Sequence, residues 1–219
     1  MQQILSYLKD LENNNNREWF KANKTRYTEV QERFEEYIML LIAKVQEIDP
    51  GVKVNSPKEC TFRIYRDIRF SKNKLPYKDH MGAHISDGGR KSPKAGYYLH
   101  ISPDNCFAGG GVYHPQPKIL KAIRNEIFEN PEEFKAIINE PKFKETFDGI
   151  YGERLKTAPR GFPKIWPDIE LLRPKSYALI HPLSEKEITN PNLFNILEDI
   201  FRTQYNFNQY MNRIIKNIK

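Results

Sequence analysis

The chain has 219 residues, of which 39% are hydrophobic, and a formal net charge of +7. This length supports one sizeable core, and no linker, repeat or low-complexity run divides it, so we predict a single domain over residues 1–219. The longest apolar run, Ile38 to Ala43, is too short to cross a bilayer, and the first residues lack the pattern of a signal peptide. We therefore expect a cytoplasmic protein without a membrane partner.

The positive charge is local. Residues 58–94 hold ten Lys and Arg against four Asp and Glu, whereas the rest of the chain holds 25 against 24. One concentrated basic patch indicates a bound anion or a docking face rather than general attraction to nucleic acid or membrane.

The chain begins with helices. Apolar residues from Ile4 to Leu11 recur at helical spacing, and Asn13 to Asn16 then interrupt the pattern before a second helix starts near Arg17. A long amphipathic stripe follows and ends before Asp49. These segments predict an N-terminal helical layer that packs on a core.

The middle of the chain predicts strands. Thr61 to Phe70 alternates between apolar and polar residues, with Phe62, Ile64, Ile68 and Phe70 on one face and Arg63, Tyr65, Asp67 and Arg69 on the other. Short links join the apolar stretches that follow, which indicates an antiparallel meander. The further strands expected are 81–85, 96–101, 106–113 and 175–180.

Helices return after His114, again at Pro131, and in two C-terminal amphipathic segments around 193–201 and 210–218. The predicted fold class is therefore α+β, an antiparallel sheet of about five strands with a central meander, packed with long N- and C-terminal amphipathic helices. The loop 87–95 between two strands is basic, and we expect it to be mobile.

The strand period also predicts where the chemistry lies. In three successive strands the apolar residues share one face, so the polar residues gather on the other. The residues placed on this polar face are Arg63, Tyr65, Asp67, Arg69, His80, His84, Tyr98 and His100.

The arginines favour a site that binds an anion. Arg63 and Arg69 lie on one face, and with Lys72 or Lys78 from the next turn they suit bidentate recognition of phosphate or carboxylate. The alternative is a solvated salt-bridge lattice through Asp67. Arg66 falls on the apolar side of the same strand, where we expect a carboxylate or several carbonyls beside it, or a bulge that turns it outward. Its role is either a buried ion pair or part of the ligand site.

Histidines are the better candidates for proton transfer. Adjacent positive charge makes Asp67 a weak base, so we expect it to orient an arginine. We assign proton transfer to His80 or His100. Tyr65 or Tyr98 would position the molecule. His80 and His84 lie about 13 Å apart on a strand, too far to share one ion, and we predict no metal site.

Two further residues complete the predicted site. Gly110, inside a run of three glycines, marks a bulge or a backbone that something approaches closely, either the ligand or a packed aromatic side chain. Arg160 lies in a loop flanked by Pro and Gly and either closes over the ligand or is an ordinary exposed arginine.

The arginine stretch resembles the defining motif of an uncharacterised family, domain of unknown function 2461. The likeness extends over nearly the whole chain and implies no established reaction, substrate, cofactor or catalytic residue. The residues that carry it are Arg63, Arg66, Asp67, Arg69, Phe70, Asn73, Lys74 and Tyr77, with 17–20, 97–100, 109–111, 158–162 and 175–176.

These observations predict a protein that binds a small phosphate- or carboxylate-bearing molecule in an arginine-lined cleft. In one interpretation the protein also acts on this molecule. The alternative is a nucleic-acid-binding or protein-interaction module that uses the basic patch 58–94, with loop 87–95 docking an acidic partner. The sequence leaves open whether the protein is an enzyme, which cofactor it uses and its oligomeric state.

Overall fold

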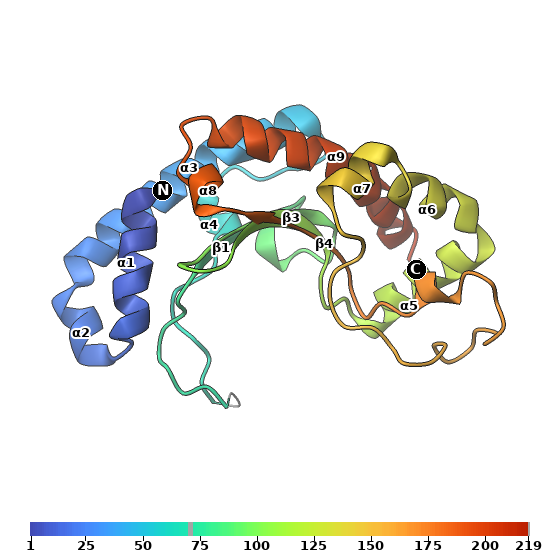
Figure 1. The fold of residues 1–219 in the computed structure, drawn as a ribbon, viewed down its shortest axis with the longest axis horizontal. Helices are drawn as coiled ribbons and strands as arrows, with labels where there is room; N and C mark the ends of the chain where they lie inside the picture. The colour runs from blue at the N-terminus through green and yellow to red at the C-terminus, as the bar shows by residue number, and fades with distance from the viewer. Residues whose placement is uncertain (70–71, 219) are drawn as a thin grey trace.

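A computed structural model describes residues 1–69 and 72–218 and has an α+β fold (Figure 1). The described part of the chain contains one antiparallel sheet with the strand order β1-β2-β3-β4. Its strands are β1 Met81–Ile85, β2 Gly96–Ile101, β3 Cys106–Val112 and β4 Tyr177–Leu183. The predicted meander is thus confirmed from β1 to β3, and the described residues form four strands rather than the predicted five or so.

Helices precede, interrupt and follow this sheet. The N-terminal ones are α1 Gln2–Asn13, α2 Arg17–Ala22, α3 Lys24–Ile48 and α4 Pro57–Cys60, and the short 3-10 turn η1 is Gly89–Lys91. Between β3 and β4 lie α5 Pro117–Glu129, α6 Pro131–Ile138, α7 Pro141–Thr146 and η2 Ile169–Leu172. The chain closes with α8 Glu185–Ile188 and α9 Leu193–Lys216. The two predicted C-terminal segments therefore form one continuous helix.

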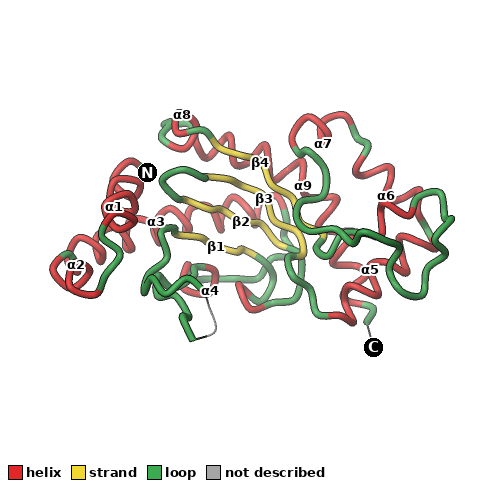
Figure 2. The backbone as a smooth tube through the Cα atoms, turned by 60° about the horizontal axis from the view of Figure 1, so that its bottom comes forward, coloured by secondary structure: helices red, strands yellow, loops and turns green. Residues whose placement is uncertain are grey.

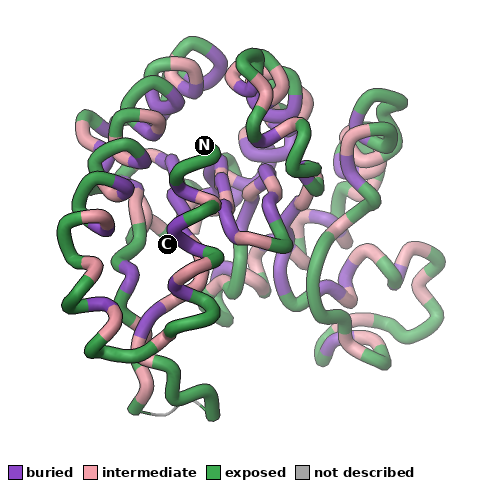
Figure 3. Tube along the Cα trace, turned by 60° about the vertical axis from the view of Figure 1, so that its left-hand side comes forward, coloured by how far each residue is buried: buried purple, intermediate pink, exposed green. Residues whose placement is uncertain are grey.

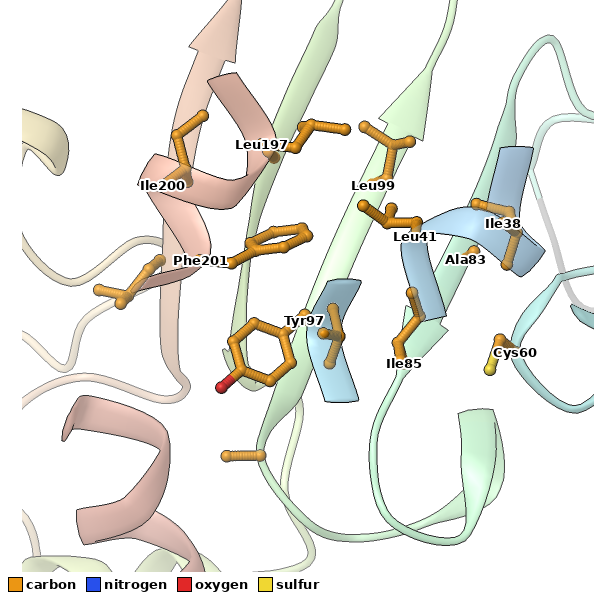
Figure 4. Close-up of a cluster of buried hydrophobic side chains, with 14 of the residues drawn as sticks. Ile38, Leu41, Cys60, Ala83, Ile85, Tyr97, Leu99, Leu197, Ile200 and Phe201 are labelled. Atoms are coloured by element: carbon orange, nitrogen blue, oxygen red, sulfur yellow. The ribbon is translucent and has the colours of Figure 1, made fainter. Parts of the chain in front are cut away.

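The two longest helices, α3 and α9, cover one face of the sheet (Figures 1 and 2). Alternate strand residues point into this layer, and burial is concentrated there (Figure 3). Figure 4 shows Ile38 and Leu41 of α3 and Phe201 of α9 gathered over the sheet. Burial of this apolar area is the main driving force for the fold. The strand residues that face the helices include Ala83, Ile85, Tyr97, Leu99 and Ala108.

The predicted strand at 61–70 is wrong for the residues that the structure describes. Residues 61–69 make only isolated bridges, and with residues 72–79 they form the two arms of a hairpin that projects on the side away from α3 and α9 (Figure 1). Within these described arms, backbone pairing is confined to the base, through hydrogen bonds from the Lys78 amide to the Ile64 carbonyl and from the Arg66 amide to the Pro76 carbonyl.

Side chains that bond to the local backbone explain why the hairpin does not continue as a ladder. Asp67 accepts the Arg69 amide, and Asn73 accepts the Leu75 amide. Such contacts compete with strand pairing. The predicted alternation also fails, because Ile64 is buried whereas Phe62 is 40% exposed. Phe70, which the same pattern placed with them, lies outside the described residues.

Asn15, from the turn between α1 and α2, fixes the base of the hairpin. Its side chain pairs with both backbone groups of Tyr77, accepting from the amide and donating to the carbonyl, each at 3.1 Å. The Tyr77 ring stacks on Phe20 of α2, with centroids 3.9 Å apart. One asparagine thus supplies the partner that a neighbouring strand would otherwise supply.

We predict that Asn15→Ala lowers the free energy of unfolding by about 2 kcal/mol, because it leaves the Tyr77 amide without its partner. Asn13→Ala is the matched control, since Asn13 is exposed and bonds only to the Lys9 carbonyl of its own helix. This control should stay within about 0.5 kcal/mol of the wild type. Urea unfolding at 25 °C measures both, and equal losses would contradict the role of Asn15.

Candidate functional site

The face of the sheet opposite α3 and α9 carries the polar strand residues, as predicted. On this face Tyr98 lies between His84 and Gly109 on the neighbouring strands, and His100 lies between Gly82 and Phe107. A side chain at position 82 would displace Tyr98, because a Cβ there would lie 2.5 Å from the Tyr98 hydroxyl oxygen. The small residue leaves room for the tyrosine to lie across the strand.

Two histidines meet at the edge of this face. His80 immediately precedes β1, and its ring centroid lies 4.5 Å from that of His100 on β2. The Tyr98 hydroxyl lies 3.1 Å from Nδ1 of His100, and the Phe107 ring stacks on His100 at 4.6 Å with an interplanar angle of 11°. His100 is thus held on three sides.

Asp79 connects the histidines to the arginine hairpin. One carboxylate oxygen lies 3.1 Å from Nδ1 of His80, and the other lies 3.6 Å from Nη2 of Arg66. Arg66 also donates from Nε to the Tyr77 carbonyl. The expectation that Arg66 requires a carboxylate or a carbonyl beside it is confirmed, and the arginine reaches the site through Asp79.

Positive charge accumulates beside this group. Lys78 is half-buried, and burial, Arg63 and Arg66 lower the pKa of its ammonium group. Its Nζ lies over the Phe62 ring, 5.5 Å from the centroid. Within the described residues no ion pair joins Lys78 to a carboxylate. A half-buried cation held near two others is electrostatically unfavourable.

Burial keeps the histidines neutral. It lowers the pKa of His84 and of His100 to about 4, and His80 adds to the effect on His100. Burial also lowers the pKa of His80, against the opposing pull of Asp79. Burial disfavours the charge on Asp79, but its hydrogen bond to His80 and the nearby cations outweigh this and lower its pKa. At neutral pH the site therefore holds an ionised carboxylate and neutral imidazoles.

Asp67 and Arg69 lie apart from this cluster and pair with each other. Arg69 donates from Nε and Nη2 to the two carboxylate oxygens of Asp67, at 3.0 and 2.7 Å, and these bonds lower the pKa of Asp67 to about 2. Both side chains are exposed. This is the solvated pair that stood as the alternative to an anion clamp, and Asp67 has the orienting role expected of it.

The other predicted residues divide by location. Tyr65 packs against Phe20 and Tyr77 and is 47% exposed, and Lys72 is exposed near the hairpin tip. Gly110 faces α9, where a Cβ would lie 2.0 Å from the Gly96 carbonyl oxygen and 2.7 Å from Nε2 of Gln204. Arg160 is exposed in the loop that precedes η2. A ligand role for these four residues stays a prediction.

The sequence interpretation missed three members of the cluster: Asp79, Phe107 and Phe62. Asp79 had a usable signal, since a carboxylate next to a histidine at the start of a strand is placed to orient its ring. Phe107 and Phe62 had none, because their roles depend on which rings of other segments they meet.

Within the described residues, no three His, Cys, Asp or Glu side chains are arranged to hold a metal ion. Among the described helices, none combines the length and the apolar character needed to cross a membrane.

A family model described as "Conserved hypothetical protein (DUF2461)" matches residues 3–210. The chain belongs to this family. The resemblance inferred from the sequence is thus confirmed over nearly the whole chain. No curated protein and no solved structure matches the chain. A function for this DUF2461 protein must therefore be argued from the site.

The low pKa of His100 predicts an acid-sensitive fold. Because the folded pKa of about 4 lies below the unfolded value of about 6.5, the stability that the neutral imidazole contributes is complete above pH 6.5 and is lost as the pH falls towards 4. At pH 4.5 this loss is roughly 2 kcal/mol relative to pH 7.5. His100→Gln should therefore reduce the difference in unfolding free energy between the two pH values by about that amount.

The matched control is His114→Gln, at an exposed histidine. Urea unfolding at both pH values compares the variants, so that titrating carboxylates cancel. An unchanged pH dependence in His100→Gln would show that His100 does not titrate with a lowered pKa.

Proposed function

We propose that this protein binds a small anionic molecule, bearing a phosphate or a carboxylate, in front of His80 and His100. The observation that carries the proposal is the position of Lys78, a half-buried cation whose pKa is lowered by burial, Arg63 and Arg66. A bound anion offsets both the repulsion and the lost hydration, and Lys and Arg side chains bind phosphate and carboxylate by charge-assisted hydrogen bonds.

The surroundings support a small ligand. Arg66 is oriented by the Tyr77 carbonyl and by Asp79, so its guanidinium does not have to be ordered on binding. The His80 side chain is 29% exposed, so a molecule held by Lys78 is able to reach the imidazole from solvent.

Docking of an acidic partner on loop 87–95 has less support. Arg90 of this loop donates to the Lys58 carbonyl, and Lys94 pairs with Asp87. Two of the three cations that would attract a partner already have local partners. The alternative of nucleic-acid binding rests on the exposed Arg63 and the neighbouring exposed Phe62, which would contact a phosphate and stack on a base.

Thermal unfolding against a panel of sugar phosphates, nucleotides, polycarboxylates and short oligonucleotides tests the proposal. A ligand at about a hundred times its Kd stabilises the native state by roughly 2.7 kcal/mol, which raises the Tm by about 5–10 °C for a chain of this size. Lys78→Gln should weaken binding of that ligand about 10- to 100-fold.

The same substitution should leave the ligand-free Tm unchanged or raise it, because it removes a cation that the folded state disfavours. Lys164→Gln, at an exposed lysine elsewhere, is the matched control and should alter neither value. Stabilisation by oligonucleotides alone, falling steeply with salt, would favour the nucleic-acid alternative. No stabilisation by any member of the panel would contradict anion binding.

A further inference from the structure

The two histidines differ in the partner of Nδ1. Nδ1 of His80 lies 3.1 Å from a carboxylate oxygen of Asp79. An ionised carboxylate only accepts hydrogen bonds, so Nδ1 of His80 carries the proton. Nε2 of His80 is then left with a lone pair and is a proton acceptor.

His100 has the opposite arrangement. Its Nδ1 lies 3.1 Å from the Tyr98 hydroxyl, and a phenol is a ready donor to a neutral imidazole nitrogen. Burial raises the pKa of Tyr98 to about 12, which keeps the proton on the hydroxyl oxygen. With Nδ1 accepting, Nε2 of His100 carries the proton and is a hydrogen-bond donor.

We propose that His80 and His100 form a proton-transfer pair, in which His80 removes a proton from a carbon next to a carbonyl of the bound anion and His100 holds the carbonyl oxygen. The ring centroids lie 4.5 Å apart, so the ring that carries the acceptor is adjacent to the ring that carries the donor. This inference rests on the proposed function, since Lys78 and Arg66 would bring the anion to the pair.

The step balances without a further reactant. The C–H bond breaks, and the proton forms a bond to Nε2 of His80, which becomes an imidazolium stabilised by Asp79. The electron pair forms the carbon–carbon double bond of an enolate, and Nε2–H of His100 donates to the oxygen that gains the negative charge. The imidazolium then returns its proton to the same carbon, or exchanges it with water first, which places a solvent hydrogen on that carbon.

His100 acts here as a donor and not as an acid. If it gave up its Nε2 proton, Nδ1 would have to take the proton of Tyr98, and a buried phenolate is disfavoured. A neutral imidazole therefore suits stabilisation of an enolate oxygen. Asp79 and Tyr98 are positioning residues that fix the two tautomers, and the Phe107 ring stacked on His100 prevents its rotation.

The tautomers are tested first, without any ligand. Long-range proton–nitrogen spectra of protein labelled with 15N-histidine, at pH 7.5, should show His80 with the proton on Nδ1, the minor form of free histidine, and His100 with the proton on Nε2. Asp79→Asn should shift His80 towards the Nε2 form, which a purely structural role of Asp79 would not do. If either histidine of the wild type carries its proton on the other ring nitrogen, the proposed proton-transfer pair is overturned.

Proton transfer is tested in D2O with dihydroxyacetone phosphate, fructose 6-phosphate and 2-oxoglutarate as probes, with loss of the exchangeable C–H signal followed by proton NMR. We expect exchange of at least one probe about 100-fold faster than in buffer, and a 100-fold or greater loss of that acceleration in His80→Gln. His114→Gln should retain it.

Thermal unfolding with the same probes separates the two hypotheses. A probe that raises the Tm of the wild type, but exchanges no faster than in buffer, would overturn proton transfer and leave anion binding intact. If no probe raises the Tm, anion binding by these classes fails, and the proton-transfer inference fails with it.

Discussion

The backbone of Tyr77 is the point on which the site depends. Asn15 pairs with its amide and carbonyl, Arg66 donates to the same carbonyl, and Phe20 stacks on its ring. The three residues that follow it are Lys78, Asp79 and His80. Because a peptide chain has only two soft torsions per residue, fixing one peptide group strongly limits where the next side chains lie. An asparagine 62 residues away in the chain thereby positions the candidate site.

In this arrangement, the segments that support the candidate site come from two different parts of the fold. The N-terminal helices hold the hairpin base through Asn15 and Phe20, while the sheet holds His100 and Tyr98 from the other side. His80 lies at the junction, and its ring meets a sheet residue at 4.5 Å. A site built between two rigid supports loses little conformational freedom when a ligand binds, which favours affinity.

Strand periodicity predicted the sheet part of the site. The period of two placed Tyr98 and His100 opposite the apolar residues because both faces of β2 are distinguished by burial. The same reasoning failed for 61–69, where local side-chain bonds from Asp67 and Asn73 replace a ladder. An arginine-rich alternation in a hairpin looks the same in sequence as one in a strand. Only tertiary partners distinguish the two.

For a similar reason, the sequence could not distinguish the pairing of Arg69 with Asp67 from an arginine clamp on an anion. Residues two apart meet equally well on a strand face and across a tight bend, and the sequence contains no information on solvent exposure of the hairpin. The position of Gly110 is a further case. A run of glycines indicates close approach of some group, and the groups here are the Gly96 carbonyl of β2 and the side chain of Gln204, more than ninety residues later in the chain.

The charges of the site are mutually consistent with a ligand that is itself negative. Burial, Arg63 and Arg66 disfavour protonation of Lys78, and burial, Lys78 and Arg66 disfavour protonation of His80. A bound anion reverses the sign of that field, so it must raise the proton affinity of Lys78 and His80 together. In the proposed function, anion binding and basicity at His80 are therefore linked, because the negative charge of the ligand held at Lys78 makes the nearby imidazole a stronger base. Before binding, the positive field leaves His80 neutral and able to accept a proton. Once a proton has moved, the negative charge of the bound ligand stabilises the imidazolium.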